Sequence, residues 1–115
     1  MLFASRFIES SGNRILNICD TDLVDRIIKD GETEIKISSN YYNENTIDEI
    51  EAEHLLEKCT SANMVGEKTI SLSLKLGVGS EAGVRRIDGI PFLLIFKMYS
   101  SQLYIKNIIF VCGKA

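Results

Sequence analysis

The stretch Cys59-Thr60-Ser61-Ala62-Asn63-Met64-Val65-Gly66-Glu67-Lys68 is the part of the chain on which the predicted fold depends. It lies between two segments of helical character. The first turn of a helix leaves backbone N–H groups unpaired, and Ser61 or Asn63 can cap the second helix. Gly66 lets another backbone or a ligand approach closely. Free amides at the positive end of a helix dipole bind anions, so the joint is a candidate anion site; the alternative is a capped helix start whose glycine serves packing.

The two segments that flank this joint differ in how clearly they predict a helix. Upstream, Thr46 and Glu49 form a capping box, which predicts a helix that runs to about Lys58. The residues expected to face inward are Ile47, Ile50, Leu55 and Cys59. Downstream, residues 69–76 alternate polar and apolar, as a strand does, but they also give a broad apolar arc when wound as a helix that Gly77 ends. Periodicity alone does not decide between the two, and the capping residues upstream favour the helix.

Two hairpins are expected on either side of this helical region. Residues 3–9 and 14–19 are short apolar runs separated by Ser-Ser-Gly-Asn, and residues 84–87 and 90–96 flank Asp88-Gly89. The run from Phe92 to Phe96 lacks alternation, which predicts a strand covered on both faces at the centre of the sheet.

A short helix and a third strand are expected between the first hairpin and the capping box. Asp20-Thr21-Asp22 can cap the helix and Gly31 can end it, while residues 34–37 alternate like a strand. These elements predict an α+β fold: one small domain over residues 1–98, with a mixed or antiparallel sheet built from two hairpins and helices packed against it. Residues 99–115 are an apolar extension, either an added strand or a partner-docking segment.

Composition and charge limit the classes of function. The chain has 115 residues, 45% of them hydrophobic, and a net charge of -3, which argues against a protein that coats nucleic acid by bulk charge. No DNA partner is therefore expected. No apolar run approaches the length of a membrane span, and residues 1–8 do not resemble a signal peptide, so a cytoplasmic protein without membrane contact is predicted. Three cysteines without a CxxC pair and a single histidine, His54, predict no metal site and no cofactor.

Several motifs of the chain together resemble a known family. They are Cys19-Asp20, Gly31, Tyr41-Tyr42, Ser61-Ala62-Asn63-Met64-Val65-Gly66-Glu67, Leu76-Gly77 and Arg86-Ile87-Asp88-Gly89-Ile90-Pro91. Over about residues 3 to 97 the chain resembles a family of small archaeal proteins catalogued only as a domain of unknown function, family 424. The resemblance implies a helix from Met64 to Leu76 and an archaeal cytoplasmic origin. It implies no reaction, and Phe92 stands where relatives tend to carry a polar residue or histidine.

The first functional hypothesis is a non-catalytic, translation-associated accessory protein that contacts structured RNA. The amide-rich joint, Lys68 and the pair Arg85-Arg86 can bind a few phosphates, while Tyr41 and Tyr42 can stack on a base. Packing of one tyrosine over the edge of the core is the alternative role for that pair. The candidate RNA- or anion-binding residues are Ser61, Asn63, Gly66, Lys68, Arg85 and Arg86. The expected partners are ribosomal RNA or tRNA, together with ribosomal or translation proteins.

Two other functions fit different features. The chain can be a protein–protein adaptor that docks through the apolar extension 99–115 or through the small residues around Gly66. It can also be a small-ligand-binding protein or an enzyme that uses Asn63, Glu67 and His54, although no nucleophile–base pair stands out.

Overall fold

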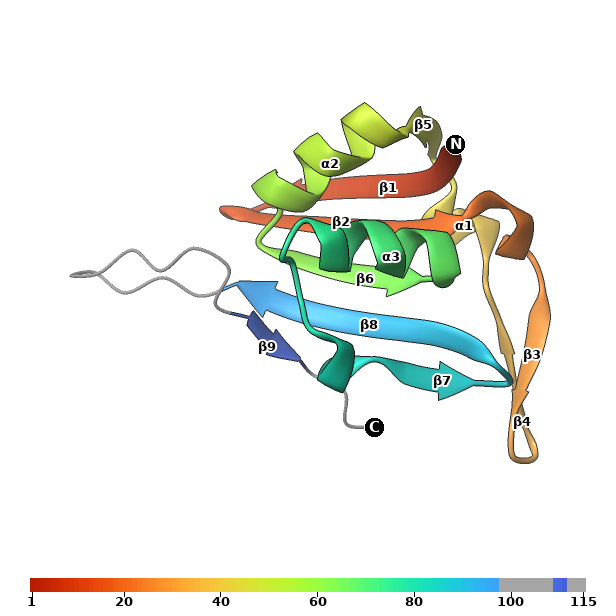
Figure 1. Ribbon diagram of the computed structural model, residues 1–115. Helices are drawn as coiled ribbons and strands as arrows, with labels where there is room; N and C mark the ends of the chain where they lie inside the picture. Colours follow the sequence, from red (N-terminus) through yellow and green to blue (C-terminus); the bar gives the residue numbers. More distant parts are fainter. Residues whose placement is uncertain (98–108, 112–115) are drawn as a thin grey trace.

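A mixed β-sheet forms the centre of the molecule in the computed structural model, which describes residues 1–97 and strand 109–111 (Figure 1). The strand order is β5-β1-β2-β6-β8-β7, and β9 also pairs with β8. The strands are β1 (Leu2–Ser10), β2 (Asn13–Asp20), β5 (Asn45–Asp48), β6 (Ser61–Val65), β7 (Arg85–Ile87), β8 (Ile90–Lys97) and β9 (Ile109–Val111). The predicted α+β fold with a mixed sheet is confirmed.

Both predicted hairpins are present, and each turns tightly. Ser11 and Gly12 connect β1 to β2 with φ angles of 52° and 82°, and Asp88 and Gly89 connect β7 to β8 with φ angles of 55° and 79°. Positive φ at two consecutive turn residues is typical of type I′ turns, whose twist matches that of the paired strands.

The predicted joint between two helices is wrong, because residues 61–65 form strand β6. This strand pairs parallel with β2, with Ile15 opposite Ser61 and Cys19 opposite Val65, and antiparallel with β8. Side chains alternate across a strand, so Ala62 and Met64 point to one face of the sheet and Asn63 to the other. A short strand of small and polar residues resembles a capping segment when only residue types are considered.

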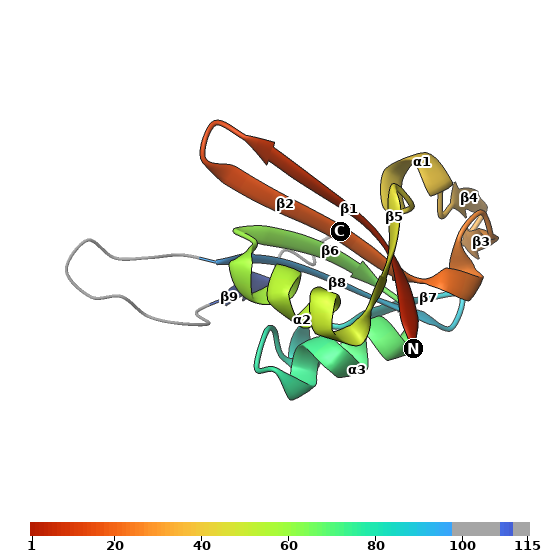
Figure 2. The same ribbon diagram turned by 90° about the horizontal axis from the view of Figure 1, so that it is seen from above.

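Two helices cover one face of the sheet, as the view from above shows (Figure 2). Helix α3 (Glu67–Lys75) confirms that residues 69–75 are helical and not a strand, but the expected start at Met64 is wrong, because Met64 and Val65 belong to β6. Helix α2 (Glu49–Lys58) begins later than predicted and takes its cap from Asp48, whose carboxylate accepts a hydrogen bond from the Glu51 amide at 2.9 Å. Thr46 does not cap it, because residues 45–48 pair with β1 as β5. Ile50, predicted to face inward, is 70% exposed.

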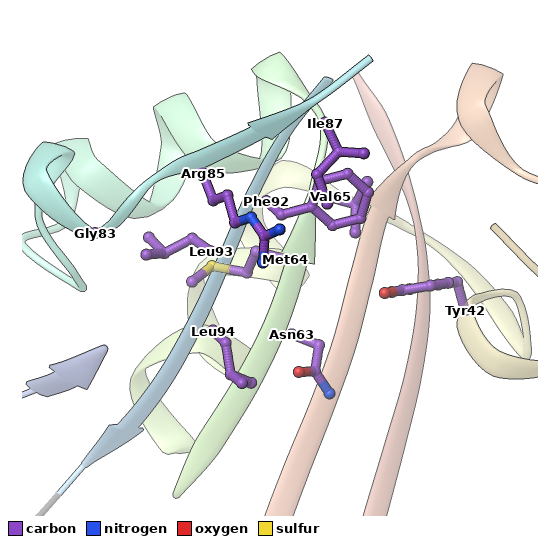
Figure 3. Close-up of a pocket in the computed structure, with 10 residues that line it drawn as sticks. All are labelled: Tyr42, Asn63, Met64, Val65, Gly83, Arg85, Ile87, Phe92, Leu93 and Leu94. Carbon is purple, nitrogen blue, oxygen red and sulfur yellow. The ribbon is translucent and has the colours of Figure 1, made fainter. Parts of the chain in front are cut away.

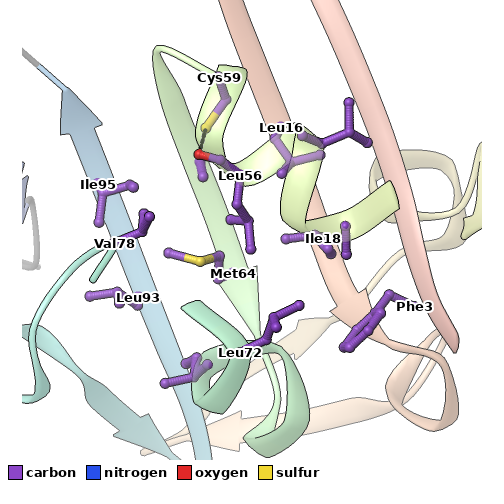
Figure 4. Close-up of a cluster of buried hydrophobic side chains, with 14 residues drawn as sticks. Phe3, Leu16, Ile18, Leu56, Cys59, Met64, Leu72, Val78, Leu93 and Ile95 are labelled. Atoms are coloured by element: carbon purple, nitrogen blue, oxygen red, sulfur yellow. Dashed lines mark hydrogen bonds between the residues drawn. The ribbon is translucent and has the colours of Figure 1, made fainter. Parts of the chain in front are cut away.

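The main hydrophobic core lies between these helices and the sheet (Figure 4). Its largest fully buried side chains include Phe3, Leu16, Ile18, Leu56, Met64, Leu93 and Ile95. Every second residue of the central strands contributes to it, which is the alternation that a sheet with one covered face requires.

The opposite face of the sheet is partly covered by residues 21–43, which we call the arm. It contains η1 (Thr21–Leu23), β3 (Ile27–Asp30), β4 (Thr33–Lys36) and α1 (Ser39–Tyr42), and β3 and β4 form a separate two-stranded sheet. The predicted helix ending at Gly31 is wrong, because Gly31, with φ 68°, lies in the turn between β3 and β4. A second cluster packs the arm onto the sheet: Cys19, Leu23, Ile28, Ile37, Tyr42, Val65 and Ile90.

Strand β8 is not the fully covered central strand that its composition predicts. It lies between β6 on one side and β7 and β9 on the other, its residues alternate between buried and partly exposed, and Phe96 is 43% exposed. The short helix η2 (Glu81–Gly83) precedes β7. Apart from the backbone pairing of β9, the predictions for residues 99–115 fall outside the described residues. None of the helices within residues 1–97 is both long and apolar enough to cross a membrane.

Candidate functional site

The N-terminus of α3, the predicted anion site, is occupied by a carboxylate of the protein itself. Asp20, at the end of β2, accepts hydrogen bonds from the amides of Lys68 at 3.0 Å and Thr69 at 2.8 Å, and from the Thr69 hydroxyl at 2.7 Å. Asp20 is only 6% exposed and Thr69 is fully buried. The parallel pairing of β2 with β6 places the carboxylate at the positive end of the helix, where a bound anion would otherwise sit.

Gly66 is needed at this junction because a larger residue would clash with Asp20. Its φ of 110° is a conformation that side chains other than glycine rarely adopt, and an added Cβ would lie 2.3 Å from Asp20 Cγ. The expectation that this turn presents unpaired amides to a ligand is therefore wrong. Gly66 makes room for Asp20, and the Lys68 amide binds it.

The two predicted arginines point to opposite faces of the sheet. Arg86 lies on the helix side and pairs with Glu67 at 2.7 Å, and this hydrogen bond lowers the pKa of the exposed Glu67 carboxyl. Arg85 stands opposite Phe92 on the other face, 3.6 Å from the carboxylate of Asp30 in the arm. The predicted basic pair is therefore not one phosphate-binding unit.

Ser61 and Asn63, predicted as helix caps, lie instead on the sheet face opposite the helices, beside the arm, which covers this part of the sheet only in part. We call this surface the open face; strand register and alternation assign to it two rows across β1, β2, β6 and β8. The rows are Arg6–Asn17–Asn63–Leu94 and Ile8–Ile15–Ser61–Phe96. All eight residues except Asn17 and Phe96 are half-buried; Asn17 is buried and Phe96 is exposed.

A hydrogen-bond network joins this face to the arm. Asn63 Nδ2 donates to Asn17 Oδ1 at 2.7 Å and to the Tyr41 hydroxyl oxygen at 3.2 Å, while Asn17 Nδ2 donates to the Tyr41 carbonyl at 3.2 Å. Asn17 is 1% exposed, so its amide needs these partners to offset the loss of water. The network fixes Tyr41 over the sheet beside Asn63.

The two predicted stacking tyrosines have different environments. Tyr41 is 45% exposed, whereas Tyr42 is 9% exposed and packs in the second cluster, with the two rings edge to face and their centroids 4.9 Å apart. Burial is the main cause that raises the pKa of Tyr42. The structure therefore leaves one ring available for stacking, and packing is the role of the other.

A hollow of about 220 Å³ adjoins the open face between β7 and the arm (Figure 3). Asn63, Leu94 and Phe92 line it from the sheet, while Arg85 and Tyr42 line it from β7 and the arm. It has an apolar floor with a guanidinium and a carboxamide at its sides. Such a surface fits a flat, partly polar group, and no described residue in it is a nucleophile.

The residues considered for an enzyme are not brought together. Asn63 lies on the open face, His54 is exposed on α2 across the sheet, and Glu67 pairs with Arg86 at the start of α3. The pocket that Glu67 lines includes neither Asp20 nor Asp88. Within the described part of the chain, no group of three or more potential metal-ligating side chains is found.

Two of the three cysteines are buried thiols. Cys19 and Cys59 are both inaccessible; burial, with the neighbouring Asp20 carboxylate as a smaller cause, raises the pKa of Cys19 to about 12. Burial also raises the pKa of Cys59. Both residues therefore serve packing, as expected for reduced buried cysteines, while the side chain of Cys112 lies beyond the described residues.

Sequence reasoning missed two polar residues that shape this surface. Arg6 and Asn17 interrupt apolar strands at positions that alternation assigns to the face opposite the core, and they lie opposite each other in the β1–β2 hairpin. The signal in the sequence was an asparagine placed among Ile15, Leu16 and Ile18. When it is buried, as here, such a residue needs hydrogen-bond partners from elsewhere in the chain.

Comparisons with known proteins identify the family and not the activity. No curated protein matches the chain. The chain is similar to a solved structure described as an uncharacterized conserved protein from Methanopyrus kandleri, with a TM-score of 0.74 and 17% sequence identity, over 87% of this chain and 96% of that chain. That similarity shows the fold alone. A family model described as "Protein of unknown function (DUF424)" matches residues 8–98, and the chain therefore belongs to the DUF424 family.

Proposed function

We propose that the protein is a non-catalytic, translation-associated accessory protein that contacts ribosomal or other structured RNA, and that the open face makes the contact. The observation that carries this proposal is the grouping of Ser61, Asn63 and Arg6 on the sheet face opposite the helices, with Tyr41 of the arm hydrogen-bonded beside them. The originally expected contact through the amides of α3 has no room for a phosphate, because Asp20 already occupies it.

The charge distribution over the sheet supports an anionic partner despite the net charge of -3. The chain has 16 acidic residues, yet none of the eight residues of the open face is acidic. Arg6 stands at the β1 end of this face, and Arg85, which pairs with Asp30, stands beyond β8 at the other. Phosphates need only a few local cations when the surface between them does not repel them.

The side chains of the open face also suit nucleobases. Exposed sheet surfaces that carry aromatic rings bind unstacked bases in several families of RNA-binding domains. Here Tyr41 and Phe96 are each more than 40% exposed, and Ser61 and Asn63 add polar atoms next to them. Loops, bulges and ends of structured RNA offer such bases, whereas paired bases in a helix do not.

The test is the affinity for tRNA and for ribosomal subunits as a function of salt. We expect binding at low salt, with an affinity that falls steeply between about 50 and 200 mM salt because counterions are released from the RNA. Phe96→Glu places a carboxylate on the open face and should weaken binding at least about tenfold. Ile50→Glu is the matched control, since it adds the same charge at an exposed apolar position on α2, and it should leave the affinity unchanged.

Two results would refute this proposal. One is the absence of binding to tRNA and to both ribosomal subunits at low salt. The other is an equal loss of affinity in the Phe96→Glu and Ile50→Glu variants, because RNA would then respond to net charge and not to the open face.

An adaptor function is the second candidate, and one row of the open face favours it. Ile8, Ile15 and Phe96 form an apolar row, and apolar surface that is not covered favours association with another protein. Recovery of a stoichiometric protein partner after ribonuclease treatment, lost in Phe96→Glu and retained in Ile50→Glu, would support the adaptor over the RNA-binding protein. Docking through residues 99–115 concerns a segment whose side chains lie outside the described residues.

A further inference from the structure

We infer that a pocket between β1, β4 and α1 binds one nucleotide, with the phosphate between Arg6 and Lys36 and the base against Tyr41. This inference deepens the proposed function, because the pocket adjoins the open face at Tyr41. Its volume is about 480 Å³. The lining residues are Arg6, Lys36, Ser38, Asn40, Tyr41 and Tyr42.

The charge of the pocket is the first reason. Its lining contains two cations and no carboxylate. Arg6 Nη1 donates a weak hydrogen bond to the Asn40 carbonyl at 3.5 Å, which leaves the other guanidinium donors available for a ligand. Within residues 1–97, Lys36 has no ion-pair partner, in contrast to Arg85 and Arg86, which contact Asp30 and Glu67. The two unneutralised cations therefore favour an anion here over the sites predicted from sequence.

The position of Tyr41 is the second reason. Its ring is 45% exposed, and three contacts hold the residue in place: the edge-to-face packing on Tyr42 and the hydrogen bonds from Asn17 and Asn63. A ring that is already ordered loses little conformational entropy when a base stacks on it. Ser38 and Asn40 supply hydroxyl and amide groups nearby that can bind a ribose or a base edge.

A nucleotide uses both features at once. Inorganic phosphate would use only the cations, and an uncharged aromatic ligand would use only the tyrosine. The same chemistry occurs in free nucleotides and in single-stranded RNA. In the RNA case the strand continues from Tyr41 onto the open face, because the Tyr41 hydroxyl is hydrogen-bonded to Asn63. Duplex RNA keeps its bases stacked inside and does not fit.

The experiment measures the affinities of adenosine monophosphate, adenosine, inorganic phosphate and a short single-stranded oligoadenylate by calorimetry and by amide chemical shifts. We expect the mononucleotide to bind more tightly than adenosine or phosphate, and the oligoadenylate more tightly still. Arg6→Gln and Lys36→Gln should each weaken mononucleotide binding about three- to tenfold and leave adenosine binding unchanged. Lys68→Gln, which removes an exposed lysine on the helix side, is the matched control and should have no effect.

The tyrosine is tested with a pair of variants. Tyr41→Phe keeps the ring and should retain most of the affinity, whereas Tyr41→Ala should lose it. Because Tyr41→Ala can also loosen the arm, circular dichroism and the amide spectrum of the arm are recorded for both variants. Binding that is equal in Tyr41→Ala and Tyr41→Phe, with the arm intact, would overturn the stacking.

The outcomes separate this inference from the proposed function. If RNA binds and responds to Phe96→Glu while Arg6→Gln and Lys36→Gln change nothing, the pocket is wrong and the RNA-binding function stands. If the mononucleotide binds as expected while no RNA binds, the pocket stands as a small-nucleotide site and the RNA-binding function is wrong. If phosphate alone binds as tightly as the mononucleotide, the nucleotide assignment is overturned.

Discussion

The interaction of Asp20 with the N-terminus of α3 makes the clearest stability prediction. Replacing Asp20 with alanine removes the acceptor for the Lys68 amide, the Thr69 amide and the Thr69 hydroxyl. Thr69 is fully buried, so its two donors are expected to lose their hydrogen bonds with little compensation from water. The Lys68 amide is at the exposed end of the turn, and water can replace its partner.

The expected loss in the free energy of unfolding is about 3 kcal/mol. Each buried donor left unpaired costs about 1 to 3 kcal/mol, and the loss of a cap from the start of a helix costs about 1 kcal/mol. The three bonds share one carboxylate, so these terms overlap and do not add in full. Asp20→Asn keeps one acceptor oxygen and loses the charge at the helix dipole, so about half of the loss is expected.

Urea unfolding at neutral pH, followed by circular dichroism, measures this loss. With a denaturant dependence of about 1.5 kcal/mol per molar, typical for a chain of this size, the midpoint should fall by about 2 M in Asp20→Ala. Asp22→Ala is the control, because Asp22 is exposed in η1 nearby and caps no helix; its midpoint should not change. A shift below about 0.5 M in Asp20→Ala would refute the account of this junction.

Three further predictions concern Gly66 and the buried cysteines. Gly66→Ala should destabilise the protein by at least about 2 kcal/mol, because the alanine would have a positive φ and its Cβ would clash with Asp20. The loss should be smaller in an Asp20→Ala background, where the clash is gone. A double-mutant cycle in urea measures this coupling, and additive losses would contradict the clash. In a Cys112→Ser background, Cys19 and Cys59 should resist alkylation at pH 8 until urea unfolds the chain, because burial raises both pKa values and the pKa of Cys19 to about 12. Since the raised pKa favours the thiol in the folded state, this contribution to stability is present below the unfolded pKa and is lost as the pH rises above it, which unfolding curves at increasing alkaline pH would show.

Much of the fold follows from local sequence signals. The turns at Gly12 and Gly89 were predictable, because turn glycines act over a few positions. The presence of α2 and its end near Lys58 were also predicted, but its expected cap was not, and the family resemblance decided the helical interpretation of residues 69–76. Strand β6 was not, because its place in the sheet comes from pairing with β2, whose residues lie 46 positions earlier. Residue types suited to helix caps also suit a short central strand with one polar face.

The candidate site was likewise predictable only where the signal is local in sequence. For the pair Tyr41-Tyr42, the sequence left two roles open: stacking on a base, or packing over the edge of the core. The exposed Tyr41 fits the first role and the buried Tyr42 fits the second. The occupation of the α3 terminus by Asp20 was not predictable, since a carboxylate 48 residues away in sequence has no local signal. Arg85 and Arg86 are adjacent in sequence, but alternation along β7 separates them onto opposite faces, so a basic pair in a strand is rarely one binding unit.

The parallel pairing of β2 with β6 has a consequence for how the chain reaches this structure. The two hairpins close over a few residues each, whereas Ile15 and Ser61 meet only after the intervening arm, β5 and α2 have been gathered between them. Closing so long a loop costs chain entropy before any contact rewards it, and long-range pairing of this kind slows folding relative to helical bundles. The hairpins are therefore expected to be early and the middle of the sheet late, with helix α3 acquiring its partner carboxylate only in that last step.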